Sequence, residues 1–195
     1  MSPSDRHVIL MGLRGSGKST IGRLLAALMD REFVDLDDRT LAVFRDRGEA
    51  ETIAQVFERY GETRFREAEA SALREALCDH PSGRVVLALG GGSPTAPGAA
   101  DLLSDSGGAL IYLRMQPRVL VARLSGEIDS RRPALTEQGD AITEIEQVFH
   151  QRDGLYTSLA DLVFEDDLSV EETAAELVRR LKELDCGGGQ AAREY

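Results

Sequence analysis

The sequence predicts an α/β fold in which a five-stranded parallel sheet lies between two layers of helices. Short apolar segments alternate with segments of helical periodicity along most of the 195 residues, which is typical of parallel strands joined by right-handed crossovers. The apolar segments carry few polar residues, as expected for strands buried on both faces. Glycine-rich turns follow two of these strands, and ligands collect at the carboxyl ends of strands in such sheets. We therefore expect one domain, with a ligand cleft at that edge.

The predicted elements follow in a regular order. A strand at 7–11 leads through a glycine-rich turn into a helix at 20–30, and a strand at 32–35 precedes a helix at 38–47. Helical periodicity resumes at 51–60 and at 62–78, with Gly61 as the break between the two helices. The later elements are a strand at 84–89, a helix near 96–104, a strand at 109–113, a helix from Pro117 to about 124, a helix at 142–159, a strand at 161–164 and a helix at 170–184.

The most informative motif lies between the first strand and the first helix. Residues 12–19 read Gly-Leu-Arg-Gly-Ser-Gly-Lys-Ser, a complete G-x-x-x-x-G-K-[ST] phosphate-binding loop. Backbone N–H groups of such a loop converge on phosphate oxygens, Lys18 adds a positive charge, and the Ser19 hydroxyl can ligate Mg²⁺. The motif predicts that the protein binds a nucleoside triphosphate. It leaves open whether the γ-phosphate is transferred, hydrolysed or only sensed.

Composition narrows the class of partner. The chain has 23 Lys and Arg against 34 Asp and Glu, a formal charge of −11, which opposes general attraction to nucleic acid or anionic membranes. Cys78 and Cys186 are far apart and lack a metal-ligand spacing, which suits a reducing cytosol. The chain starts without a signal-peptide pattern, and no segment has the apolar length that spans a bilayer. We expect a cytoplasmic protein that binds small molecules.

Carboxylates follow the second predicted strand. Asp35 and Asp37 alternate, so both side chains would point the same way for as long as the strand continues. One can then support a phosphate-bound metal while the other accepts the proton of an attacking hydroxyl. Asp38 is expected to cap the next helix, because aspartate is favoured at that position. Helix capping also remains an alternative explanation for all three residues.

Two further features suit an anionic ligand. Arg66 and Glu69 are three apart on a predicted helix and are therefore neighbours, although taken alone they would form an ordinary surface ion pair. Gly90, Gly91 and Gly92 follow a buried strand directly. Their N–H groups allow close approach of a ligand with no side chain in the way, and the alternative is a flexible turn.

Two arginines remain candidates for phosphate or carboxylate binding. Arg132 lies with Arg131 in the polar stretch 125–139, which is expected to form a mobile lid that closes over the phosphates. Arg152 lies toward the end of the predicted helix at 142–159. Each is equally consistent with a solvated surface charge when considered singly.

Taken together, these motifs resemble the shikimate kinase family, small P-loop kinases of the nucleoside monophosphate kinase type. The resemblance spans about 7–184 and leaves a tail at 186–195 outside it. Its pieces are Gly-Leu-Arg-Gly-Ser-Gly-Lys-Ser-Thr, Val-Asp-Leu-Asp, the run from Ile53 through Gly61-Glu62 and Phe65-Arg66 to Glu69, Ala-Leu-Gly-Gly-Gly, Arg-Arg-Pro-Ala-Leu and Arg152-x-x-Leu155-Tyr156.

The resemblance implies transfer of the γ-phosphoryl group of ATP to the 3-hydroxyl of shikimate, on the route to chorismate and the aromatic amino acids. It assigns the helices within 38–78 to the acceptor, suggests a monomer and implies Mg²⁺ as cofactor, held by Ser19 and Asp35. Lys18, Asp37 and Arg132 would be catalytic. The residues implied for ATP are Gly15, Ser16, Gly17, Lys18, Ser19, Thr20, Arg123 and Arg132, and those implied for shikimate are Asp37, Arg66, Gly90, Gly91, Gly92 and Arg152.

The chain departs from the family pattern at a few positions. Gly154 stands where proline is usual before Leu-Tyr, which is expected to loosen the helix near Arg152, and Ala134 replaces a leucine after the lid Arg-Pro. Residues 165–169 contain no basic residue for the adenine. Two other functions remain open: a related small-metabolite kinase such as gluconate kinase, and a nucleotide-binding regulatory protein that has lost the reaction.

Overall fold

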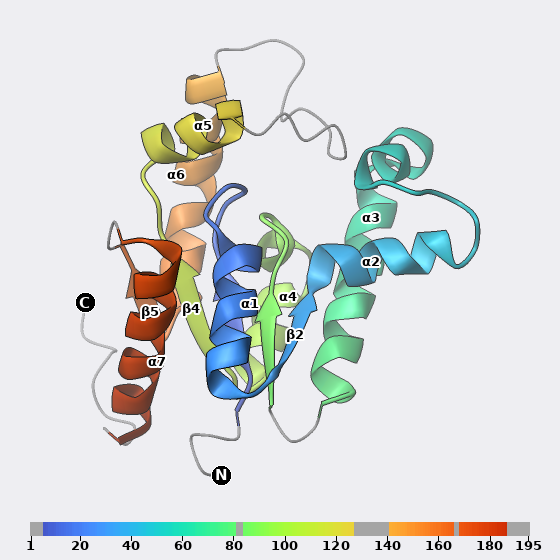
Figure 1. The fold of residues 1–195 in the computed structure, drawn as a ribbon. Coiled ribbons are helices and arrows are strands. Elements are labelled where there is room, and N and C mark those ends of the chain that lie inside the picture. Colours follow the sequence, from blue (N-terminus) through green and yellow to red (C-terminus); the bar gives the residue numbers. More distant parts are fainter. Residues whose placement is uncertain (1–5, 81–83, 127–140, 166–167, 187–195) are drawn as a thin grey trace.

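The computed structural model describes residues 6–80, 84–126, 141–165 and 168–186. The described strands form one five-stranded parallel sheet in the order β2-β3-β1-β4-β5 (Figure 1). They are β1 (Val8–Met11), β2 (Glu32–Asp35), β3 (Val85–Ala88), β4 (Ala109–Leu113) and β5 (Leu162–Phe164). This confirms the predicted fold class and the number of strands. The division into one domain remains a prediction.

The helices connect these strands in the predicted order. They are α1 (Lys18–Met29), α2 (Leu36–Arg45), α3 (Ile53–Cys78), α4 (Ala99–Asp105), α5 (Pro117–Gly126), α6 (Ala141–Leu159) and α7 (Val170–Cys186), with a short 3-10 turn, η2 (Ser93–Thr95). Within α3, Gly61 has φ 76° and ψ 172°, so the predicted break is a kink between two helical segments. The helix predicted near 96–104 begins later, at Ala99, because its N-cap is Gly98, which has the left-handed φ of 75°.

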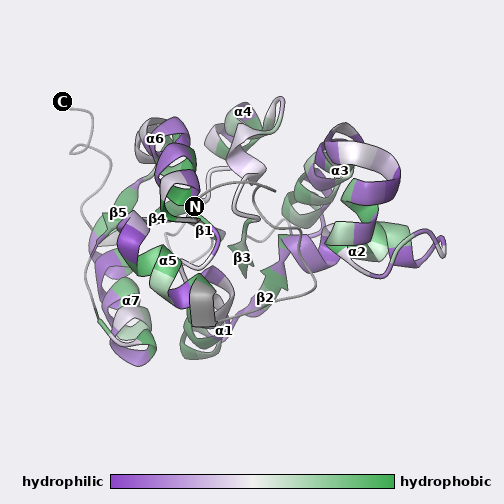
Figure 2. Ribbon diagram, turned by 90° about the horizontal axis from the view of Figure 1, so that it is seen from above, coloured by the Kyte–Doolittle hydropathy of each residue, from purple (hydrophilic) through white to green (hydrophobic). Residues whose placement is uncertain are grey.

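The sheet separates two apolar layers, and alternate residues of β1 belong to different layers. Val8 and Leu10 pack with α1 and α7, whereas Ile9 and Met11 pack with helices of the opposite face. The view from above shows α1 and α7 on one side of the sheet and α4 and α6 on the other (Figure 2). Each Val, Leu or Ile side chain buried in this way contributes about 1.5–3 kcal/mol. The three-layer α/β/α arrangement thus follows from strands that are apolar on both faces.

Helices α2 and α3 have an apolar cluster of their own beside the sheet. Its buried members include Leu41 and Phe44 on α2 and Val56 and Phe65 on α3. This cluster holds the two helices together at the edge where β2 ends, so both present side chains toward the cleft. Among the described residues, no helix has the length and apolar character needed to cross a membrane.

The last helix is longer than predicted. Helix α7 continues to Cys186, two residues beyond the predicted end and into the stretch that was expected to be the tail. Residues 187–195 lie outside the described part of the chain.

The buried imidazole of His7, just before β1, predicts a pH-dependent stability. Its Nδ1 makes no hydrogen bond within the described residues. Burial, then His80 and Arg31 nearby, lower its pKa below the ordinary 6.5, although a backbone hydrogen bond at Leu77 partly opposes them. The unfolded chain therefore binds a proton more readily, and the free energy of unfolding should fall as the pH drops from about 8 to about 5.

Chemical denaturation at several pH values checks this prediction. His7→Leu should flatten the decline in stability with falling pH, because it removes an imidazole that binds a proton more readily in the unfolded chain than in the folded one. His150→Gln removes an exposed histidine and should keep the decline. The same pH dependence in both variants would assign the decline to other groups.

Candidate active site

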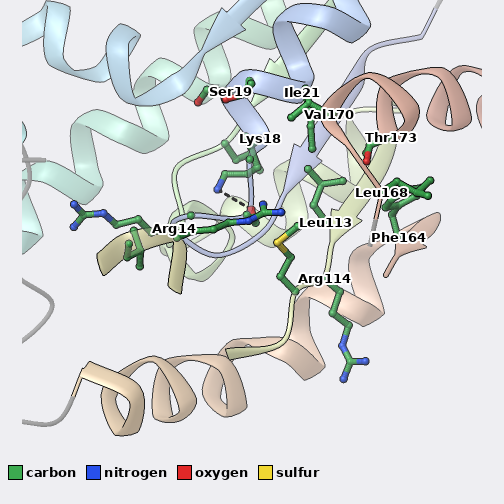
Figure 3. Close-up of a pocket in the computed structure, with 18 of the residues that line it drawn as sticks. Arg14, Lys18, Ser19, Ile21, Leu113, Arg114, Phe164, Leu168, Val170 and Thr173 are labelled. Carbon is green, nitrogen blue, oxygen red and sulfur yellow. Dashed lines mark hydrogen bonds between the residues drawn. The ribbon is translucent and has the colours of Figure 1, made fainter. Parts of the chain in front are cut away.

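A cavity of about 390 Å³ opens over the phosphate loop at the carboxyl ends of the strands (Figure 3). The loop and the first turn of α1 form one part of its wall. The other end of the cavity is more apolar, with Phe164, Leu168, Val170 and Thr173 around it. The predicted nucleotide residues that line the cavity are Gly15, Ser16, Gly17, Lys18, Ser19, Thr20 and Arg123.

Lys18 lies inside the curve of the loop. Its side chain is buried, and Nζ donates hydrogen bonds to the carbonyl oxygens of Gly12 at 2.9 Å and Leu13 at 3.0 Å. These carbonyls hold the ammonium group beside the backbone N–H groups that such a loop directs at phosphate. The loop thus presents fixed dipoles and a fixed charge from one short segment.

Ser19 and Asp35 form a pair of oxygen donors next to the loop. The Ser19 hydroxyl donates to Oδ2 of Asp35 at 2.6 Å, and Oδ1 of Asp35 accepts the N–H of Asp37 at 3.0 Å. A hydroxyl and a carboxylate are hard ligands of the kind that Mg²⁺ prefers. The prediction that these two side chains lie close together is correct. Their geometry, however, differs from the expected one.

The difference lies in where the strand ends. Helix α2 begins at Leu36, two residues earlier than predicted, and Asp35 is its N-cap. The expectation that Asp38 caps the helix was wrong, since Asp38 lies in the first turn and is exposed. The alternation argument for Asp35 and Asp37 was also wrong, because no strand continues past Asp35.

A second cavity, of about 440 Å³, adjoins the first. Its polar wall includes Arg66 and Arg152, which come from α3 and α6. Ile53, Phe57 and Phe65 supply an apolar side from α3. Among the described residues, Asp37, Arg14 and Leu124 line both cavities. The arrangement places a carboxylate at the junction of a phosphate site and a pocket lined by three arginines.

The triple glycine after β3 packs against charged groups of both cavities. A Cβ atom at Gly90 would lie 2.6 Å from Oδ1 of Asp37 and 2.7 Å from Oε1 of Glu69. At Gly92 it would lie 2.7 Å from Nη2 of Arg66. Real Cβ atoms do not approach other atoms so closely, so the segment is a tightly packed wall and not the flexible turn that remained possible.

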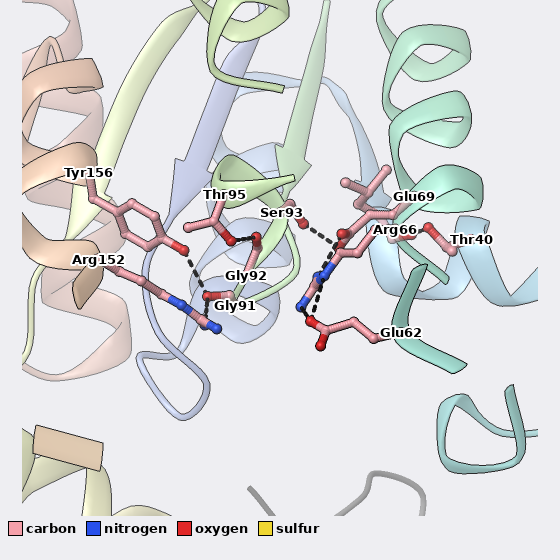
Figure 4. Close-up of polar contacts among 11 residues, drawn as sticks. Thr40, Glu62, Arg66, Glu69, Gly91, Gly92, Ser93, Thr95, Arg152 and Tyr156 are labelled. Atoms are coloured by element: carbon pink, nitrogen blue, oxygen red, sulfur yellow. Dashed lines mark hydrogen bonds and ion pairs between the residues drawn. The ribbon is translucent and has the colours of Figure 1, made fainter. Parts of the chain in front are cut away.

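Arg66 is held by a buried acid. Nη1 donates to Oε2 of Glu69 at 2.7 Å, and Oε1 of Glu69 accepts the hydroxyl of Ser93 (Figure 4). Burial alone would lower the pKa of Arg66, but the carboxylates of Glu69 and Glu62 outweigh it and raise the pKa. The pair is therefore no ordinary surface ion pair, because the Glu69 side chain is only 2 % exposed.

Arg152 is anchored to the glycine segment from the opposite side. Its Nη1 donates to the carbonyl oxygen of Gly91 at 2.8 Å, and the Tyr156 hydroxyl donates to the same oxygen at 2.8 Å (Figure 4). Burial raises the pKa of Tyr156 to about 12, so the hydroxyl is neutral at pH 7 and donates this hydrogen bond. Arg66 and Arg152 thus lie on either side of the segment that contains Gly91 and Gly92.

Sequence analysis missed the contacts that hold α6 in place. Arg114 donates from Nε and Nη2 to the two carboxylate oxygens of Asp153, at 2.7 and 2.8 Å, and the Tyr112 hydroxyl donates to Oδ1 at 3.0 Å. Hydrogen bonds from Arg114 and Tyr112 lower the pKa of Asp153. No local spacing could have linked residues 39 apart. Helix α6 runs through Gly154 without interruption, so the expected loosening at that position is not seen.

The apolar end of the nucleotide cavity was also missed. Phe164 ends β5, and Leu168, Val170 and Thr173 lie at or near the start of α7. The sequence signal available was an apolar residue, Leu168, four residues after the strand end at Phe164. In the structure Leu168 is 39 % exposed. Arg131 and Arg132 fall outside the described residues, as do positions 127–139 of the predicted lid.

Comparisons with known proteins agree with the family resemblance seen in the sequence. A family model described as shikimate kinase matches residues 14–182. A shikimate kinase of Rhodopirellula baltica is 38 % identical over 161 residues, which are 80 % of each chain. A shikimate kinase of Geobacter sulfurreducens is 38 % identical over 183 residues, 93 % of this chain and 94 % of its own.

Solved structures agree. A shikimate kinase from Acinetobacter baumannii, in complex with shikimate, superposes with a TM-score of 0.79 at 29 % identity, covering 91 % of this chain and 93 % of that one. A gluconokinase from Sinorhizobium meliloti gives a TM-score of 0.53 at 15 % identity, with 95 % and 98 % covered, which shows a shared fold only. The extent of the family match and the identity to full-length relatives show that the chain belongs to the shikimate kinase family.

Proposed function

We propose that this chain transfers the γ-phosphoryl group of ATP to the 3-hydroxyl of shikimate, giving shikimate 3-phosphate and ADP. The observation that carries the proposal is the meeting of two cavities at Asp37, one over a phosphate loop and one lined by three arginines. A donor and an anionic acceptor can therefore lie side by side, with a carboxylate between them.

The nucleotide would bind along the first cavity. Gly15 to Thr20 would surround the phosphates, with Lys18 as the fixed charge. The adenine would lie at the apolar end between Phe164 and Leu168, and Arg123 would stack near it. These assignments are supported by the residues that line the cavity and by the anion-binding character of a helix N-terminus.

Ser19 and Asp35 would hold Mg²⁺. Their donor set suits this ion, which keeps several waters and takes few protein ligands besides the phosphates. Among the described residues there is no cluster of three or more His, Cys, Asp or Glu side chains that would form a fuller metal cage. When bound, Mg²⁺ would neutralise charge on the β- and γ-phosphates.

The acceptor would bind through its carboxylate. Arg66 and Arg152 present planar guanidinium groups on either side of the glycine segment, and such groups bind carboxylates in a fixed orientation. The apolar side chains of α3 would cover a face of the ring. Because Arg66 is held by Glu69, and Arg152 by Gly91, both donors are positioned before the ligand arrives.

Asp37 would act at the reacting hydroxyl. As the hydroxyl oxygen forms its bond to the γ-phosphorus, the bond from that phosphorus to the β–γ bridging oxygen breaks, and the hydroxyl proton passes to the Asp37 carboxylate. ADP leaves with the bridging oxygen. Most of the catalysis in such a transfer comes from positioning and charge stabilisation. The Asp37 carboxylate can serve because it borders both cavities.

Several parts of this proposal still rest on the sequence. The catalytic role of Arg132, a monomeric state, a cytoplasmic location and the lack of nucleic-acid or membrane binding stay predictions.

Purified protein should release ADP from Mg-ATP when shikimate is present. A coupled assay with shikimate, gluconate and no acceptor measures this. Both acceptors carry a carboxylate, but the apolar side formed by Ile53, Phe57 and Phe65 suits the ring of shikimate and not the open polyhydroxy chain of gluconate. We therefore expect turnover with shikimate and only background with gluconate. Turnover with gluconate would favour a related small-metabolite kinase, and binding of ATP without any turnover would favour a regulatory protein.

Asp37→Asn should lower turnover by about two to four orders of magnitude, because the amide cannot accept the proton. Steady-state kinetics with saturating substrates measures the loss, and Asp38→Asn on the same helix turn is the matched control, since Asp38 is exposed and lines neither cavity. Turnover close to that of the wild type in Asp37→Asn would leave this carboxylate a positioning role only.

Arg66→Lys should weaken shikimate binding by about tenfold or more and leave ATP binding nearly unchanged, because lysine cannot form the two parallel hydrogen bonds of a guanidinium group. Calorimetric titration with each ligand measures both effects. Arg64→Lys is the control: it lies on the same helix and pairs with Glu67 at the surface. If ATP binding suffers as much as shikimate binding, Arg66 is not part of the carboxylate site.

A further inference from the structure

The phosphate loop contains a cation that its motif does not require. The motif fixes Gly12, Gly17, Lys18 and Ser19 and leaves the residues between the first two glycines free. In this chain one of the free positions is Arg14. It is partly buried.

The other free positions each face one side of the site. Leu13 lines only the second cavity, and Gly15 and Ser16 line only the nucleotide cavity. Arg14 lines both. In Figure 3 it lies across the nucleotide cavity from Phe164, Leu168 and Thr173.

The backbone of Arg14 is fixed at this junction. A Cβ atom at Gly91 would lie 2.9 Å from the Arg14 nitrogen, so the phosphate loop and the glycine segment pack directly against each other there. Gly91 is itself held through its carbonyl oxygen by Arg152 and Tyr156. The base of the Arg14 side chain is therefore placed by contacts from both halves of the site.

Most positively charged side chains around the site line one cavity or the other. Lys18 and Arg123 line the nucleotide cavity only, and Arg66 and Arg152 line the second cavity only. Among the described cations, Arg14 alone borders both. During transfer the negative charge spreads over three oxygens of a group that moves from one cavity to the other. A guanidinium group can hold two of these oxygens throughout the movement.

We propose that Arg14 binds the phosphoryl group during its transfer and then the 3-phosphate of the product, in a role separate from carboxylate binding. The proposal rests on the proposed function, since it takes shikimate as the acceptor. The alternative is that Arg14 is a third ligand of the shikimate carboxylate. The two differ in one measurable respect: the first affects binding of the phosphorylated product, whereas the second affects substrate and product equally.

The test is a pair of titrations on nucleotide-free protein, one with shikimate and one with shikimate 3-phosphate. Arg14→Gln should weaken binding of the 3-phosphate by about tenfold or more and binding of shikimate by less than about twofold. Its kcat should fall by at least about tenfold, with little change in KM for shikimate. Arg14→Lys should restore part of the affinity for the 3-phosphate, because an ammonium group keeps the charge without the fork.

Arg118→Gln is the matched control, since it removes one positive charge from an exposed position on α5 that lines neither cavity. It should leave both affinities unchanged, and thermal unfolding should show that all variants are folded. Equal weakening of both ligands in Arg14→Gln would assign the residue to the carboxylate, and no weakening of either would remove it from the site. Both results overturn the proposal. Lack of shikimate-dependent turnover in the wild type would instead overturn the proposed function.

Discussion

Three charged groups of the candidate site pack against the three glycines after β3, where the chain has no side chains. Asp37 and Glu69 press against Gly90, the backbone of Arg14 against Gly91, and the guanidinium of Arg66 against Gly92. Any larger residue would push one of these groups away, so the short segment after β3 sets the distance between the phosphate loop and the acceptor pocket. The interior position of β3, between β2 and β1, holds this segment beside both of its neighbours.

Ion pairs in and beside the site keep its cations in place. Glu69 holds Arg66 from α3, and on the other side the Arg114–Asp153 pair ties β4 to α6 one residue from Arg152. These acids are buried or half-buried, and a carboxylate in such a position is stable because it is paired. An acidic protein thus builds an anion site by pairing acids in and beside the cavities with arginines, which are thereby held in fixed positions.

The sequence allowed the sheet, the order of the helices and the phosphate loop to be predicted, because each depends on local patterns of apolar residues and glycines. It also brought together Ser19, Asp35 and Asp37 at one edge. It did not predict that α2 starts at Leu36 or that Glu69 is buried, since both depend on packing between distant segments. The Arg114–Asp153 pair joins residues far apart in the chain, and no periodic pattern records such a contact.

The separate apolar cluster of α2 and α3 has a consequence for how this protein can change over generations. The side chains that hold these helices together are distinct from the two layers that flank the sheet. A substitution at Leu41 or Val56 would therefore shift the acceptor wall while the packing around β1 stays intact. Mutations in this cluster can therefore change which acceptor binds while the residues that bind the nucleotide stay unchanged. Selection can in this way alter the acceptor without loss of nucleotide binding.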